Sequence, residues 1–162
     1  MPKQTRLALT HEAIERLTRL SELFQQRREQ LASSAGLTVS QWSVLEEIST
    51  EHFMPSMFAQ SEATSRAAVS KVIRQLLDRN LVQVAISALD GRQRDYALTH
   101  EGKTTLAKLR VEREKAIESI WLPLDPDAVN HFNKFAAELI TRIQRHAAHG
   151  SSGSTGSRND HG

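Results

Sequence analysis

The stretch SRAAVSKVIRQLLDRNLVQVAISALDGRQRDYALT, residues 65–99, decides the fold of this 162-residue chain. Its first half spaces apolar residues three and four positions apart, which predicts a helix capped by Ser65 and ending near Asn80. Its second half alternates apolar and polar residues on either side of Asp90-Gly91, which predicts two short strands joined by a tight turn. A helix followed directly by a hairpin is typical of a winged helix-turn-helix.

Helical spacing of apolar residues continues on both sides of this stretch. The expected helix boundaries are Thr10 and Gly36 for a long first helix, Ser40 and Pro55 for two short ones, and Thr99 and Pro126 for two final ones. We therefore expect a mainly α protein of about six helices with a two-stranded hairpin. The expected organisation is an N-terminal helix (1–35), a central winged lobe (36–98), C-terminal helices (99–148) and a flexible Gly/Ser-rich tail (149–162).

Composition excludes several classes of function. Hydrophobic residues make up 39% and charged residues 25%, and no apolar run approaches the roughly 20 residues needed to cross a bilayer. The chain has no cysteine, which excludes disulfides, thiolate catalysis and zinc–thiolate sites. The start lacks secretory features, so a cytoplasmic, nucleoid-associated protein is expected. Its seven histidines are scattered and no nucleophile elbow or phosphate-binding glycine loop is present, so no enzyme, metal or cofactor is expected.

Positive charge is local. The formal net charge is only +2, yet residues 66–94 hold six basic side chains against two acidic ones. The exposed side of the helix over 65–80 is expected to carry Ser65, Arg66, Ala67, Ala68, Ser70, Lys71 and Arg74. Small residues allow the backbone to approach a DNA groove, Arg66 and Lys71 suit guanine edges or phosphates, and Arg74 suits a phosphate. The alternative is an amphipathic helix whose basic face is only solvated.

The hairpin adds a second cationic element. Arg92 and Arg94 are expected at its tip, where an arginine can enter the narrow minor groove of A·T-rich DNA. Asp90 and Gly91 would shape the turn, and Asp90 would hold Arg92 through a charge-assisted hydrogen bond. An incidentally charged hairpin is the alternative, and the order of helix and hairpin makes it less favourable.

Three segments resemble a known family: LTVSQWSVLEEIS (37–49), SRAAVSKVIRQLLDRNLV (65–82) and DGRQRDYALTHEG (90–102). They are similar to signature segments of the MarR family of bacterial transcriptional regulators, and the resemblance covers roughly residues 10–147. The family pattern matches at Asp90, Arg92, Leu98, Thr99 and Gly102. It implies a homodimer that binds a palindromic operator and usually represses. It also implies a minor-groove role for Arg92 and groove-facing positions for Ser65, Ala67, Ala68, Ser70 and Lys71.

One segment departs from the family. In the turn before the recognition helix the family usually has an apolar residue, a glycine and another apolar residue. Here those places hold Glu62, Ala63 and Thr64. The angle between the two helices of the motif is therefore the least determined part of the expected fold.

The flanking helices carry apolar stripes wider than a small winged lobe can cover. Candidate dimerisation residues are Leu9, Ile14, Phe132, Phe135, Leu139 and Ile143. Burial in a shared two-chain core is one interpretation, and a bundle within one chain is the other. A two-fold dimer would meet half-sites roughly 10 bp apart.

The resemblance also implies an effector, a small aromatic acid or phenol that releases the DNA. Trp42 is a candidate aromatic platform, and Arg16 or Arg19 a candidate carboxylate partner. The alternative places Trp42 in the core and the arginines in solvent. A different function also stays open, a winged-helix module that binds protein without ligand response.

Overall fold

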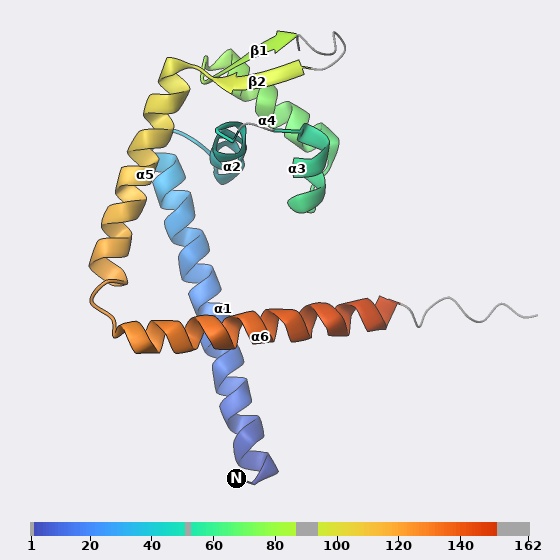
Figure 1. Cartoon of the computed structure of the whole chain (residues 1–162), viewed down its shortest axis with the longest axis vertical. Helices are drawn as coiled ribbons and strands as arrows, with labels where there is room; N and C mark the ends of the chain where they lie inside the picture. The colour runs from blue at the N-terminus through green and yellow to red at the C-terminus, as the bar shows by residue number, and fades with distance from the viewer. Residues whose placement is uncertain (1, 51–52, 87–93, 152–162) are drawn as a thin grey trace, which may run out of the picture. The chain divides into compact units, whose positions relative to one another are not determined.

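The structure, a computed structural model, describes residues 2–50, 53–86 and 94–151. Its elements are α1 (Lys3–Ser34), α2 (Val39–Ile48), α3 (Pro55–Ser61), α4 (Arg66–Asp78), β1 (Val82–Ile86), β2 (Arg94–Leu98), α5 (His100–Ile120) and α6 (Pro126–Ser151) (Figure 1). The two strands pair antiparallel, with Val82 opposite Leu98 and Ile86 opposite Arg94. The expected mainly helical fold with a two-stranded hairpin is confirmed.

The chain divides into two compact units, residues 1–114 and 115–162. The first holds the helix-turn-helix, the hairpin and the first part of α5, together with α1. The second holds the end of α5 and all of α6, which runs to Ser151 and so includes the first three residues of the predicted tail (149–162). In the described residues, no helix is both long and apolar enough to span a membrane.

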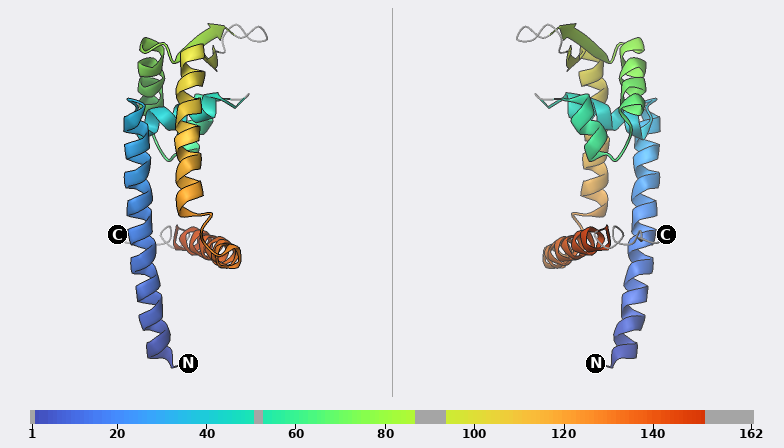
Figure 2. Two further views of the ribbon diagram at one scale, coloured as in Figure 1. Left: turned by 90° about the vertical axis from the view of Figure 1, so that its left-hand side faces the viewer. Right: turned by 90° about the vertical axis from the view of Figure 1, so that its right-hand side faces the viewer.

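A single apolar core holds the first unit together. Its most deeply buried large side chains are Val44, Leu45, Leu76, Leu106 and Leu109, which come from α2, α4 and α5. The C-terminal end of α1 also contributes buried residues to this core. Both views of Figure 2 show α4 beside the hairpin. Burial of one Leu side chain stabilises the fold by about 1.5–3 kcal/mol. Because Leu76 of α4 is completely buried here, this core holds α4 in one orientation.

Several predicted helix ends are confirmed. The Ser65 hydroxyl accepts a hydrogen bond from the Ala68 amide (3.1 Å), and Pro55 occupies the first turn of α3. After α4 the chain turns through Asn80, whose φ of 55° lies in the left-handed region that Asn tolerates. The Thr99 hydroxyl accepts from the Gly102 amide (3.0 Å) at the start of α5.

Two predicted caps are wrong. The first helix begins at Lys3, and the Thr10 hydroxyl donates to the Arg6 carbonyl (2.8 Å) inside it, so Thr10 does not cap. In α2 the cap is Thr38 and not Ser40, because Thr38 and Gln41 exchange hydrogen bonds in a capping box. Each of the two misassigned residues lies inside its helix, where a hydroxyl is tolerated.

Gly102 fixes how closely α5 approaches the loop before the hairpin. A Cβ at this position would lie 2.0 Å from the Leu81 carbonyl oxygen. Around this approach the Thr99 amide donates to the same carbonyl (3.1 Å) and the Thr99 hydroxyl donates to the Asn80 carbonyl (2.7 Å). Thr99 and Gly102, three residues apart, therefore hold the start of α5 against the segment between α4 and the hairpin.

Candidate nucleic-acid interface

The turn between α3 and α4 contains a strained residue. Ala63 has φ of 48°, the left-handed region that glycine adopts freely and alanine does not. The turn is closed by hydrogen bonds from the Ala63 amide to the Gln60 carbonyl (3.2 Å) and from the Thr64 amide to the Ala59 carbonyl (2.9 Å). The helix-turn-helix therefore forms although alanine stands where the family has glycine.

The predicted recognition helix, α4, has two distinct faces. Val69, Ile73 and Leu76 are buried and anchor the helix to the core. The seven residues predicted for the outer side are all exposed: Ser65, Arg66, Ala67, Ala68, Ser70, Lys71 and Arg74. The helix is thus anchored through its apolar face and presents small and basic side chains outward.

Three cations on the outer face have no partner in the part of the chain that the structure describes. Among the described residues, no hydrogen bond or ion pair involves the side chain of Arg66, Lys71 or Arg74. Arg79 differs, because its guanidinium donates to the Gly36 carbonyl (2.7 Å) and to Gln41 Oε1 (3.4 Å). The first three are therefore available to an external anion, whereas Arg79 is structural.

The wing residues are only partly placed. Arg94 is the first residue of β2, opposite Ile86, and β1 lies against α4. Asp90, Gly91 and Arg92 lie outside the described residues. The minor-groove roles of Arg92 and Arg94 and the turn-shaping role of Asp90 and Gly91 stay predictions.

A buried glutamine links α2 to the recognition helix, and sequence reasoning missed it. Gln41 is 7% exposed, and its Nε2 donates to Gln75 Oε1 on α4 (3.1 Å). Its Oε1 accepts from the Thr38 amide (3.0 Å) and from Arg79. The Thr38–Gln41 spacing was a usable signal, since a Gln three residues after a Thr is a capping-box pattern.

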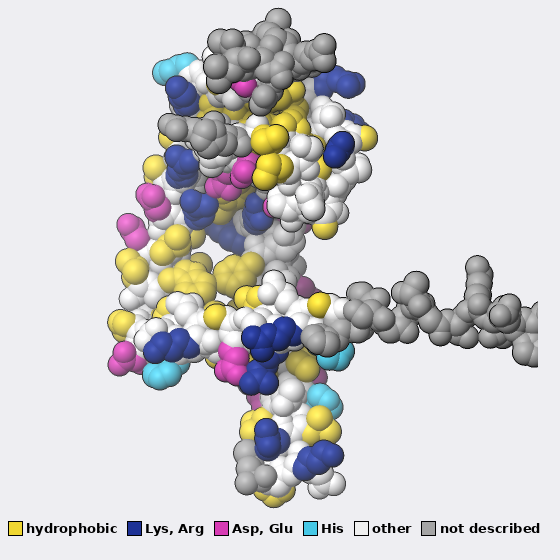
Figure 3. All heavy atoms as spheres, turned by 45° about the vertical axis from the view of Figure 1, so that its right-hand side comes forward, with side chains coloured by type: hydrophobic (Ala, Val, Ile, Leu, Met, Phe, Trp, Pro, Cys, Tyr) yellow, Lys and Arg dark blue, Asp and Glu magenta, His cyan; other side chains and the backbone are white. Residues whose placement is uncertain are grey.

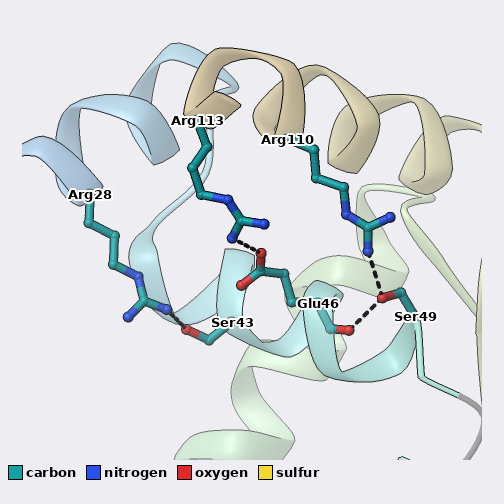
Figure 4. Close-up of polar contacts among 6 residues, drawn as sticks. All are labelled: Arg28, Ser43, Glu46, Ser49, Arg110 and Arg113. Atoms are coloured by element: carbon teal, nitrogen blue, oxygen red, sulfur yellow. Dashed lines mark hydrogen bonds and ion pairs between the residues drawn. The ribbon is translucent and has the colours of Figure 1, made fainter. Parts of the chain in front are cut away.

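Three further arginines, from α1 and α5, contact one face of α2 and its C-terminal cap (Figure 4). Arg28 of α1 donates to the Ser43 hydroxyl (2.6 Å), while from α5 Arg113 bonds the Glu46 carboxylate (3.0 Å) and Arg110 the Ser49 hydroxyl (3.2 Å). The Arg113–Glu46 pair is partly exposed, so its stabilisation is modest, roughly 1 kcal/mol or less. Together these contacts connect the recognition lobe to the long helices.

The predicted effector residues are not brought together. Trp42 is only 3% exposed, so its ring is a core element and offers no accessible platform. The residue on α1 that reaches it is Arg28, whose guanidinium carbon lies 5.7 Å from the ring centroid. Arg16 precedes Arg28 by twelve residues, about 18 Å along the helix at 1.5 Å per residue. Within one chain the structure therefore does not bring Arg16 and Arg19 to Trp42, and the effector role of these residues stays a prediction.

Both of those α1 arginines have local partners. Arg16 pairs with Glu12 (2.5 Å) and Arg19 with Glu22 (3.0 Å), all exposed on the helix surface. The hydrogen bond and the charge of Glu12 raise the pKa of Arg16. These are solvated intrahelical pairs, as the alternative interpretation held.

A different pocket lies at the base of the hairpin. It has a volume of about 490 Å³ and is bounded by the end of α2, both strands and α5. Its charged residues are Lys103 and Arg110, and none of the described residues that line it is a carboxylate; Tyr96 and Leu106 supply apolar surface. The described residues contain no cluster of His, Asp and Glu that could hold a metal ion.

The residues predicted for dimerisation lie on open helix surfaces. Leu9 and Ile14 of α1 are 50% and 54% exposed, and Phe135 and Ile143 of α6 are 55% and 60% exposed. Phe132 is exposed as well and Leu139 is half-buried. Figure 3 shows hydrophobic side chains at the surface of both helices. Their role in dimerisation stays a prediction.

Together, the tri-helical motif, the hairpin and the long flanking helices define a winged helix-turn-helix protein. The fold is that of the MarR family transcription regulators. One such regulator superposes with a TM-score of 0.81 at 16% identity, covering 90% of this chain and 97% of the other. Comparison with known sequences finds no matching family model and no matching curated protein.

Two further neighbours have ligands in their structures. Staphylococcus aureus MepR in complex with DNA has a TM-score of 0.65 at 14% identity, covering 78% of this chain and 93% of the other. Staphylococcus aureus MarR in complex with salicylate and kanamycin has a TM-score of 0.72 at 15% identity, covering 85% and 94%. At these identities the likeness is one of fold, and the neighbours are transcription regulators.

Proposed function

We propose that this protein is a homodimeric, sequence-specific DNA-binding transcription regulator. The observation that carries the proposal is the outer face of α4, where Arg66, Lys71 and Arg74 are exposed beside small residues and pair with no described residue. Side chains of this kind bind phosphates and base edges when a helix enters the major groove. The complex of the neighbouring MepR with DNA supports the same use of the fold.

The proposed assembly is a two-fold dimer built from α1 and α6. Large apolar side chains on these helices are half exposed in the single chain, and burial of apolar area contributes about 25 cal/mol per Å². Two α4 helices held by such a dimer would meet half-sites roughly 10 bp apart, which calls for a palindromic operator.

We propose further that the protein is a cytoplasmic repressor that a small aromatic acid or phenol releases from its operator. The pocket at the base of the hairpin supports an acidic effector, because Lys103 and Arg110 line it and none of its described lining residues is acidic. The salicylate bound to the neighbouring MarR is a ligand of that chemical class. A ligand here would release DNA only if it binds the DNA-free arrangement more tightly.

Salt titration tests the DNA-binding proposal. Genomic fragments captured by the purified protein are titrated by fluorescence anisotropy from low to physiological salt. Contacts with several phosphates should make the affinity fall steeply, with a log–log slope of about −0.9 per phosphate. Replacing Lys71 by Gln should reduce that slope by about one, whereas Lys108→Gln on α5 is the matched control that should leave it unchanged.

The wing is tested separately. Arg92→Ala should lower affinity for a captured fragment roughly tenfold or more while the dimer stays folded, because a minor-groove arginine contributes about 1–3 kcal/mol. An unchanged mobility-shift titration would remove the wing from the mechanism. The competing function is a protein-binding module. Failure to bind duplex DNA even at low salt would favour it.

A further inference from the structure

A second groove lies behind the recognition helix. It has a volume of about 350 Å³, within the size range of small-molecule sites, and is formed by the C-terminal part of α1, by α2 and by the helix-turn-helix. Its apolar wall consists of Val39, Val44, Phe58, Val69 and Val72. This surface is separate from the Lys103–Arg110 pocket, with which it shares no residue.

The groove is lined by two charged residues of opposite sign. Arg28 enters from α1 and Glu62 from the turn that follows α3. No ion pair joins them: Arg28 donates to the neutral Ser43 hydroxyl (2.6 Å, Figure 4) and lies near the Trp42 ring. Within the described part of the chain, no hydrogen bond engages the Glu62 carboxylate. Each charge therefore keeps capacity for a strong hydrogen bond.

We propose that this groove binds an amphoteric small molecule, whose carboxylate pairs with Arg28, whose amine pairs with Glu62, and whose apolar body packs on the valines. A purely anionic ligand would face the Glu62 carboxylate, and a purely cationic ligand would face the Arg28 guanidinium. Only a ligand with both groups satisfies both residues. Glu62 stands where the family has an apolar residue, so this preference belongs to the present chain.

Occupancy would act on the recognition helix. Ala68, Val69 and Val72 of α4 line the groove, and Val69 also anchors α4 to the core, so a bound ligand would contact α4 directly beside this anchor. Any difference in ligand affinity between two positions of α4 shifts the balance between them. The site itself does not depend on DNA binding, so its failure and the failure of the proposed function are distinguishable.

Calorimetry on the full chain tests the proposal with three probes: 4-(aminomethyl)benzoate, benzoate and benzylamine. At low ionic strength the amphoteric probe should bind roughly tenfold or more tightly than either monofunctional probe, because it forms both charge-assisted hydrogen bonds. Arg28→Gln and Glu62→Gln should each weaken the amphoteric probe about five- to tenfold. Circular dichroism checks that both variants are folded.

Matched controls remove the same charges outside the groove. Arg27→Gln on α1 and Glu47→Gln on α2 should leave the affinity for the amphoteric probe unchanged. Lys103→Gln should also leave it unchanged, which separates this groove from the pocket at the base of the hairpin. Equal affinities for the three probes, no binding of the amphoteric probe, or a loss on Lys103→Gln but not on Glu62→Gln would each overturn the proposal.

Discussion

The winged lobe and the long flanking helices differ in how far their large apolar side chains are buried. In the lobe, the large apolar side chains of α2 and α4, such as Leu45 and Leu76, are completely buried within one chain. Along α1 and α6, residues of similar size such as Phe24, Phe135 and Ile143 are more than half exposed. The lobe therefore completes its core within one chain, with the end of α1 and the first part of α5, whereas the rest of α1 and α6 carry surface that a second chain would cover.

This contrast predicts that the two regions fail independently. Phe135→Asp places a charge on the α6 surface and should convert the dimer to monomer, with DNA affinity falling by roughly a hundredfold or more as two-site binding is lost. The lobe should stay folded, because Phe135 contributes nothing to its core. Sedimentation velocity measures the assembly and circular dichroism the fold.

Asn133→Asp is the matched control, since it adds the same side chain two residues away at an exposed position that is already polar. A stable, active dimer in the Phe135→Asp variant would contradict the assignment of this face to the interface.

The opposite failure is expected at the junction of α5 with the lobe. Gly102→Ala would bring a Cβ to 2.0 Å from the Leu81 carbonyl oxygen, which forces the two backbones apart. The free energy of unfolding should fall by roughly 3 kcal/mol, at the upper end of overpacking costs. Urea denaturation measures this loss, and Glu101→Ala, one residue earlier and exposed, should change stability by less than about 1 kcal/mol.

Sequence patterns predicted most helix ends of the lobe because these signals are local, although the predicted Ser40 cap of α2 is wrong. Ser65, Thr99, Pro55 and Asn80 each satisfy a backbone requirement that can be recognised without knowing the tertiary contacts. The Thr10 cap failed for the opposite reason: a good capping residue inside a helix looks the same as one at its end. Only continued helical geometry back to Lys3 distinguishes them.

The candidate ligand-binding residues were harder to predict from sequence than the helix ends, because a ligand site depends on contacts between segments that are distant in the chain. Trp42 was a reasonable aromatic platform until packing showed it buried, and Arg28, not Arg16 or Arg19, is the α1 cation that reaches it. The link from Gln41 to Gln75 spans 34 positions. Sequence periodicity does not indicate which residues so far apart in the chain come into contact. Polar contacts between helices could therefore be identified only from the structure.

The smallest expected effect concerns the turn between α3 and α4, which lies wholly within the lobe. Ala63 has φ of 48°, and the left-handed conformation costs a residue with a Cβ about 1–2 kcal/mol. Ala63→Gly should therefore raise the free energy of unfolding, but only by about 0.5 kcal/mol, because glycine also gains entropy in the unfolded chain.

The same substitution at Ala67, inside α4, is the control and should have the opposite sign. Ala67 lies in the first turn of α4. Glycine costs about 0.8–1 kcal/mol relative to alanine in a helix interior and less near an end, so Ala67→Gly should lower stability by less than about 1 kcal/mol in urea denaturation. Neither variant should change the oligomeric state, because both positions lie in the lobe. A loss of stability in Ala63→Gly would mean that the turn is not strained by its alanine, and that the departure from the family's glycine costs this fold nothing.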